Sequence, residues 1–336
     1  MRSLLVAFVA VLALACSAPA VPRDTAAPPP LSEAPSLPSF VRAVAPAVVR
    51  ITAHVPRNRP SVLTLGPTRI GAGVIFDPAG YALTVGYIVM DADTILVGLR
   101  DGQTVPARLV GMDLEHGLGI LKLDGAGPWP TARLGDSRRV AVGDPTATLG
   151  VEESNELKVT TGSVQAIRSF AGYWEYSLDR AIIVAPANPA FGGSPLVNAR
   201  GEVIGITSLR LGEPPHVNLA IPLEVFTEAR EEVLKTGHLQ PKGPRPWIGV
   251  YTVETSEGLA VAGGSPVGPA AEAGFQQGDL ILRLNGEKVE GQEDFYRKLW
   301  KSRPGEELTI LVLRENRFHA VKLRPIDRYK MLAPER

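Results

Sequence analysis

The stretch IGAGVIFDPAGYALTVGYIV, residues 70–89, carries the pattern that decides the fold. Its apolar, β-branched run at residues 72–76 ends in Asp, Pro and Gly, which stop strands and form turns. Many short strands separated by such turn residues predict an all-β barrel or sandwich. Runs of the same kind occur at residues 48–51, 95–99, 119–123, 182–184 and 203–206.

A helix is predicted where this β region ends. Pro222 is expected to begin it and Gly237 to end it. A stiff, Pro-rich joint follows at residues 241–246, and then a second unit whose pattern reads β, turn, helix, β, helix, β. In that unit, residues 293–300 are predicted to be helical and residues 308–313 to form a strand. The apolar face of the first helix consists of Val225, Phe226, Ala229, Val233 and Leu234.

Composition excludes several classes of function. The chain has 336 residues, of which 45% are hydrophobic and 21% charged, so it can form two globular domains. Its formal net charge is zero, and no strong field draws in nucleic acid. No zinc knuckle or P-loop is present, and Gly71 and Gly73 lack the third glycine of a dinucleotide site, so we interpret them as a turn. We predict no metal site, no cofactor and no nucleic-acid partner.

The N-terminus predicts export. Residues 1–20 have the basic start, short apolar core and small residues of a signal peptide, and residues 21–39 form a Pro/Ala-rich linker. The only cysteine, Cys16, directly follows the apolar core, and this arrangement resembles a bacterial lipoprotein signal. Two interpretations stay open: Cys16 is lipidated and anchors the chain to a membrane, or it is removed with the signal. Either predicts the periplasm or envelope.

Residues 70–89 resemble the HtrA/DegP family of trypsin-like serine proteases. This resemblance implies a mostly β protein with a chymotrypsin-like double β-barrel over residues 40–238 and a cleft between the barrels. Four further segments carry it: HGLGILKLD (116–124), LGDSRRVAVGD (134–144), LKVTTGSVQAI (157–167) and NARGEVIGITS (198–208).

The resemblance also implies that the catalytic triad is degenerate. A serine protease needs a nucleophilic hydroxyl, a base beside it and a carboxylate that orients the base. The family's base, carboxylate and nucleophile positions fall on Tyr87, Gly117 and Gly192. The family's oxyanion-hole glycine is replaced by Ala190. None of these side chains can perform triad chemistry, and misalignment does not explain them, because the spacing needs no insertion.

A relocated site is the alternative, with Ser194 as the nucleophile and His116 as the base. We expect Ser194 instead to fill space or bond to the local backbone. Glu115 adjoins His116, but neighbours on a strand point to opposite faces. His216 lies in a Pro-rich loop and is expected to be solvated. For Tyr87 and Phe191 two interpretations remain, either plugging the former cleft or shaping a peptide groove.

Residues 246–326 resemble a PDZ domain of the HtrA type, on the segments SPVGPAAEAG (265–274), QGDLI (277–281) and LNGEKV (284–289). A PDZ domain binds an extended peptide at a sheet edge and captures its terminal carboxylate with backbone amides. The resemblance implies that Trp247, Ile248, Gly249 and Val250 form the carboxylate loop. Leu299 could line the side-chain pocket or belong to the core. Ile248, Val250 and Tyr296 are further pocket candidates, and Phe295 is assigned to the core.

The leading interpretation is an exported HtrA-like pseudoprotease that binds protein C-termini or unfolded polypeptides through its PDZ domain. It would serve as a scaffold, regulator or chaperone-like factor in envelope protein quality control. The resemblance implies a homotrimer or a mixed trimer with active relatives. The rival interpretation is a serine endopeptidase with a relocated or residual active site.

Overall fold

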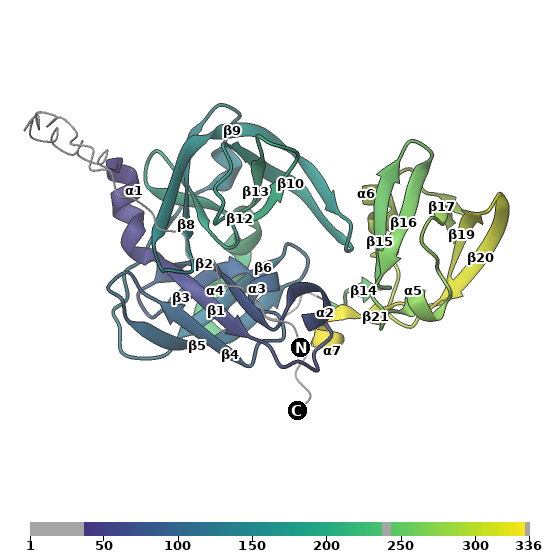
Figure 1. Ribbon diagram of the computed structural model, residues 1–336, viewed down its shortest axis with the longest axis horizontal. Coiled ribbons are helices and arrows are strands. Elements are labelled where there is room, and N and C mark those ends of the chain that lie inside the picture. The colour runs from purple at the N-terminus through teal and green to yellow at the C-terminus, as the bar shows by residue number, and fades with distance from the viewer. Residues whose placement is uncertain (1–36, 237–242, 333–336) are drawn as a thin grey trace, which may run out of the picture. The chain divides into compact units, whose positions relative to one another are not determined.

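The computed structural model describes residues 37–236 and 243–332 (Figure 1). The signal predicted at residues 1–20, with Cys16, lies outside the described residues, and so does the linker up to residue 36. The same holds for residues 237–242, which include the start of the predicted joint. Within the described ranges, no helix is both long and apolar enough to cross a membrane.

The first barrel is a closed sheet in the order β1-β2-β3-β6-β5-β4, with antiparallel pairing throughout. A short helix α1 (Ser39–Val44) and a 3₁₀ turn (Ala45–Ala47) lead into it. Two one-turn helices, α2 (Val62–Leu65) and α3 (Gly86–Val89), lie in its connections. Its strands are β1 (Val48–His54), β2 (Thr68–Asp77), β3 (Tyr81–Val85), β4 (Thr94–Gly98), β5 (Thr104–Asp113) and β6 (Leu118–Leu123).

The second sheet runs in the order β11-β8-β9-β10-β13-β12-β7. A further pairing between β11 and β12 closes this sheet. β9 and β10 form a long antiparallel hairpin with an irregular register (Figure 1). Helix α4 (Glu224–Thr236) follows the sheet and buries Phe226 and Val233 in the core. The strands are β7 (Arg133–Leu134), β8 (Pro145–Val151), β9 (Leu157–Gly172), β10 (Tyr176–Ala185), β11 (Pro195–Asn198), β12 (Glu202–Leu211) and β13 (Val217–Pro222).

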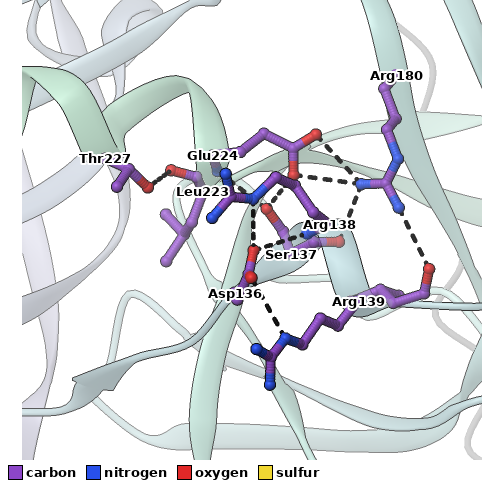
Figure 2. Close-up of polar contacts among 9 residues, drawn as sticks. Asp136, Ser137, Arg138, Arg139, Arg180, Leu223, Glu224 and Thr227 are labelled. Carbon is purple, nitrogen blue, oxygen red and sulfur yellow. Dashed lines mark hydrogen bonds and ion pairs between the residues drawn. The ribbon is translucent and has the colours of Figure 1, made fainter.

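A polar cluster fixes the start of α4 against this sheet (Figure 2). The buried Ser137 hydroxyl accepts a hydrogen bond from the Glu224 backbone N–H at 2.9 Å and donates to the Glu224 carboxylate. Arg180 on β10 points toward the same carboxylate, 3.2 Å away, and donates to the Ser137 carbonyl at 2.9 Å. An acidic side chain at a helix N-terminus is stabilising, and here it is also tied to two other segments.

The C-terminal region forms a six-stranded sheet in the order β15-β16-β17-β19-β20, in which β18 also pairs with β17, and a separate β14–β21 pair. Its hydrophobic core is separate from the cores of the two preceding sheets and includes Ile248, Phe295 and Leu299. The elements are β14 (Pro246–Trp247), β15 (Val250–Thr255), β16 (Gly258–Gly264), α5 (Pro269–Glu272), β17 (Leu280–Leu284), β18 (Glu287–Lys288), α6 (Gln292–Leu299), β19 (Leu308–Arg314), β20 (Arg317–Leu323), β21 (Ile326–Asp327) and α7 (Arg328–Leu332).

The predicted fold class, mostly β with a double barrel before a smaller domain, is confirmed. Two local interpretations were wrong. Gly71 and Gly73 lie inside β2, where a Cβ would come within 2.1 Å of Ile88 Cδ1 and 2.6 Å of Ile51 Cδ1, so close packing explains them. The β15–β16 hairpin was missed, because the apolar run of β16 at residues 259–262 is short and flanked by glycines, and the residues before it at 254–258 are exposed.

Candidate functional site

Tyr87 and Gly192 lie next to each other, as the base and nucleophile of a protease would. Tyr87 belongs to α3, directly after β3, and its hydroxyl donates to the Ser208 carbonyl at 2.8 Å. Gly192 lies in the loop between β10 and β11. A Cβ on Gly192 would lie 2.9 Å from the Tyr87 hydroxyl oxygen. The phenol therefore occupies the space into which a nucleophilic side chain would project.

An aromatic ring also fills the space beside Gly117. Gly117 lies in the turn between β5 and β6 with a φ of +84°, and a Cβ there would lie 3.1 Å from Cε2 of Tyr176. Tyr176 comes from β10, and its hydroxyl donates to the His116 carbonyl at 2.7 Å. Sequence reasoning missed Tyr176, because nothing in its neighbourhood along the chain links it to Gly117.

The two phenols stay neutral. Burial raises the pKa of Tyr87 and of Tyr176 above the ordinary value of 10.0, so neither is a proton acceptor at neutral pH. The buried Arg69 guanidinium holds Tyr87 in place by donating to the Tyr87 carbonyl at 2.9 Å and the Met90 carbonyl at 2.8 Å. The residue that the family resemblance assigns to the base position thus has a fixed backbone and a phenol without basic character.

The loop at residues 188–194 uses its polar groups internally. The Ala190 amide donates to Oδ1 of the fully buried Asn188 at 2.9 Å. The Ser194 hydroxyl is buried and donates to the Ala190 carbonyl at 2.5 Å. An oxyanion hole needs amides aimed at the substrate, and the Ala190 amide is bonded within the loop instead. The Ser194 hydroxyl bonds locally, which matches the expectation for this residue.

His116 pairs with an aspartate that sequence reasoning did not single out. Its Nδ1 lies 2.6 Å from Oδ2 of Asp113, and Glu115 and His116 belong to the turn after β5, so the premise that they are strand neighbours was wrong. Burial lowers the pKa of His116, but the hydrogen bond and charge of Asp113 and the charge of Glu115 outweigh it and raise the pKa above 6.5. In residues 37–236 and 243–332, no histidine ring is hydrogen-bonded to a serine hydroxyl. His216 bonds to the Gly212 carbonyl at 2.7 Å.

Phe191 is half-buried in the same loop. Apart from the two residues that adjoin Gly192 in the chain, the atoms nearest to a Cβ on Gly192 belong to Tyr87 and Ile88. At the nucleophile position, therefore, the Tyr87 side chain fills space. Over the part of the chain that the structure describes, no group of three His, Cys, Asp or Glu side chains could hold a metal ion.

The second candidate site, the carboxylate loop at residues 247–250, holds a carboxylate of this same chain. Gly249 adopts a φ of +80°, which turns consecutive amides toward one point. Those of Gly249 and Val250 donate to Oε1 of Glu175 at 2.6 and 3.0 Å, and that of Ile248 lies 3.3 Å from both carboxylate oxygens. Trp247, the first residue of this loop, is buried and pairs with Ile326. Glu175 was not among the predicted site residues.

The proposed side-chain pocket is packed in this structure. Leu299, Tyr296 and Phe295 are fully buried, and Ile248 and Val250 belong to the same core cluster. Leu299 thus lies in the core here, as Phe295 was expected to. Ala171, from the end of β9, packs against this cluster, so part of that burial comes from the β9–β10 hairpin.

Comparison with known proteins agrees with this architecture. Residues 71–206 match the model of the trypsin-like peptidase domain, and residues 246–324 match that of the PDZ domain. A probable periplasmic serine endoprotease, DegP-like, from Ectopseudomonas mendocina is 33% identical over 312 residues, covering 87% of this chain and 63% of that protein. The chain is a homologue of the HtrA/DegP proteases.

Other relatives of this HtrA-type chain are covered to different extents. The DegP-like protein of Halomonas elongata is 32% identical over 266 residues, 73% of this chain and 54% of that protein, so the chain spans about half the length of the DegP-like relatives. The serine endoprotease DegS of Salmonella typhimurium is 29% identical over 82% of each chain. Among solved structures, the HtrA-type protease AlgW with a decapeptide has a TM-score of 0.53 at 26% identity, covering 86% of this chain and 98% of AlgW. The serine endoprotease from Yersinia pestis has a TM-score of 0.52 at 29% identity, over 86% and 96%.

Proposed function

We propose that this HtrA-type chain is a pseudoprotease that binds polypeptide C-termini through its PDZ domain. The observation that carries the first half is the position of Tyr87, whose hydroxyl lies 2.9 Å from where a Cβ on Gly192 would be. Losing a nucleophile or base alone costs about six orders of magnitude in turnover. Here both positions, and the carboxylate position at Gly117, lack the necessary group.

The carboxylate loop supports the second half of the proposal. Three convergent amides at Ile248, Gly249 and Val250 form a cradle for a carboxylate, and this is the chemistry by which PDZ domains capture a chain terminus. The AlgW structure is that of an HtrA-type protease with a decapeptide. Unfolded or cleaved proteins that expose a free C-terminus are the ligand class that this site fits.

Export to the periplasm or envelope is part of the proposal. The DegP-like relatives carry the word periplasmic in their names, and the N-terminal signal predicted from the sequence agrees with that compartment. Lipidation at Cys16 would tether the chain there. Assembly as a homotrimer, or as a mixed trimer with active relatives, would make it a scaffold or regulator in envelope quality control.

The proposal is tested with a fluorophosphonate probe, which labels activated serine hydroxyls, and with cleavage of a fluorogenic unfolded protein. We expect neither labelling nor cleavage from the full chain. The matched control is Ser194→Ala. Labelling or cleavage that this substitution abolishes would overturn the pseudoprotease proposal and establish the alternative, a serine endopeptidase with a relocated site.

A further inference from the structure

The turn of the β9–β10 hairpin carries an unusual glutamate. Residues 173–175 connect the two strands, and Glu175 is 1% exposed at the tip. Its φ is +58°, in the left-handed region that non-glycine residues seldom adopt. A buried acid in a strained conformation needs strong local interactions to persist.

Those interactions come from the carboxylate loop of the PDZ domain. Oε1 of Glu175 accepts the Gly249 amide at 2.6 Å and the Val250 amide at 3.0 Å, and the Ile248 amide approaches within 3.3 Å. These are successive backbone amides at one point of the chain, arranged as they would be around a terminal carboxylate. A side-chain carboxylate therefore stands where the last residue of a bound peptide would place its own.

The hairpin backbone also imitates a bound peptide. The Thr252 amide on β15 donates to the Tyr173 carbonyl at 3.0 Å, which is the kind of bond that an added strand makes with a sheet edge. On α6, the Tyr296 hydroxyl donates to the Gly172 carbonyl at 2.9 Å and accepts from the Glu175 amide at 3.2 Å. The hairpin tip therefore bonds to both β15 and α6.

From these contacts we propose that Glu175 is a built-in ligand: the hairpin tip occupies the carboxylate loop in cis and excludes free C-termini until it withdraws. This inference rests on the proposed function, because it assumes that the same loop binds external peptides. It adds that the PDZ domain is closed at rest, and that a peptide must displace a segment of the protease-like domain. Peptide binding thereby becomes coupled to the conformation of β9 and β10.

The energetics favour a contact that can open. Burial raises the pKa of Glu175 to about 7, against the opposing effects of the Arg328 charge and the amide hydrogen bonds. The left-handed backbone is a second cost of docking. A terminal carboxylate on a flexible peptide would make the same hydrogen bonds without that strain, so it can compete for the loop.

The experiment compares the full chain with Glu175→Gln and Glu175→Ala, and uses Asp179→Asn, an exposed carboxylate on the same hairpin, as the matched control. The probe is a fluorescein-labelled pool of decapeptides ending in Val, Leu or Phe with a free carboxylate, alongside the same pool with an amidated end. We expect Glu175→Ala to bind the free-carboxylate pool at least about tenfold more tightly than the unmutated chain. Glu175→Gln, whose neutral amide oxygen can still accept from the loop, should bind that pool no more tightly than the unmutated chain. Asp179→Asn should not change binding.

Hydrogen exchange of the segment that contains residues 248–250 gives a readout that needs no peptide. We expect protection in the unmutated chain and in Asp179→Asn, and faster exchange in Glu175→Ala. Equal peptide affinity in the unmutated chain and Glu175→Ala, or unchanged protection in Glu175→Ala, overturns the inference while leaving peptide binding intact. Faster exchange in Glu175→Ala without any peptide binding establishes the cis contact and refutes the proposed function instead.

Discussion

At the scale of single residues, Tyr87 decides what the cleft can do. Its hydroxyl is committed to the Ser208 carbonyl, and its backbone carbonyl accepts from Arg69. The Tyr87 side chain thus has a structural role at a position where a serine protease needs a base that takes up and releases a proton. Because the phenol stays close to Gly192, the two positions are coupled by packing rather than by proton transfer.

A double-mutant cycle measures this coupling. Gly192→Ser places a Cβ 2.9 Å from the Tyr87 hydroxyl oxygen, so we expect overpacking to lower the free energy of unfolding by about 1–3 kcal/mol. Tyr87→Phe removes that oxygen, and in its background Gly192→Ser should cost less by about 1 kcal/mol or more. Urea unfolding of the four proteins gives the coupling energy. An additive pair would show that the phenol does not occupy the nucleophile's space.

Restoring the triad tests the same cleft chemically. We expect the combination Tyr87→His, Gly117→Asp and Gly192→Ser to remain within about tenfold of background cleavage, because the Tyr176 ring occupies the carboxylate's space and Ala190 keeps its amide inside the loop. Adding Tyr176→Ser and Ala190→Gly should raise cleavage of a fluorogenic unfolded substrate further. Strong activity in the triple variant alone would refute the structural reason offered here.

At the scale of elements, helix α4 makes polar contacts both with the second sheet and with the segment that precedes β8. Its amphipathic pattern follows from the sequence, and its N-terminus is held by Ser137 and Arg180 (Figure 2). The Ser137 hydroxyl is buried and both accepts and donates, so its removal leaves the Glu224 amide without its hydrogen-bond acceptor.

The contribution of this cluster is measured with Ser137→Ala. The substitution leaves the Glu224 amide without its hydrogen-bond acceptor and leaves Arg180 as the partner of the Glu224 carboxylate, and we expect it to lower the free energy of unfolding by about 1–2 kcal/mol. Arg138→Ala serves as the control, because its ion pair with Asp136 is at the surface and should have a smaller effect. Urea denaturation compares the two. If the two substitutions had the same small effect on the free energy of unfolding, the stability of α4 would come from its apolar face alone.

At the scale of the whole molecule, residues 37–236 and 243–332 belong to one compact unit, and the β9–β10 hairpin carries residues of both sites. Tyr176 lies against Gly117 in the protease-like cleft, whereas Glu175, the residue before it, lies in the PDZ carboxylate loop. A peptide that displaces Glu175 would therefore act on the strand that fills the former cleft.

Peptide binding should depend on pH for the same reason. The pKa of docked Glu175 is about 7, above its ordinary 4.5, so proton binding favours the docked hairpin and this stabilisation is lost as pH rises through 7. The groups near the carboxylate are Arg328, Arg245, Tyr251 and Tyr296. We expect the affinity for a free-carboxylate peptide to increase about tenfold or more between pH 5.5 and 8.5. For Glu175→Gln, fluorescence titrations should give a peptide affinity that does not change with pH. An affinity that depends on pH as steeply as in the unmutated chain would assign the pH dependence to another group.

Much of this protein follows from its sequence alone. Strand runs broken by Gly, Pro and Asp predicted the mostly β fold, because periodicity and turn preference are local properties. The identities of Tyr87, Gly117 and Gly192 were enough to predict a degenerate triad, since the absence of a side-chain group needs no coordinates. The hairpin β15–β16 was missed, because its apolar run at residues 259–262 is short and flanked by glycines, which weaken the strand signal.

Only the tertiary structure decided what replaces the missing groups. Tyr176 bonds to a carbonyl 60 positions away, and Glu175 bonds to amides 73–75 positions away. Such contacts depend on the length and register of β9 and β10 and on how the hairpin packs against other elements. No pattern of neighbours along the chain encodes them, because the free energy of a contact between distant segments exists only once both have folded.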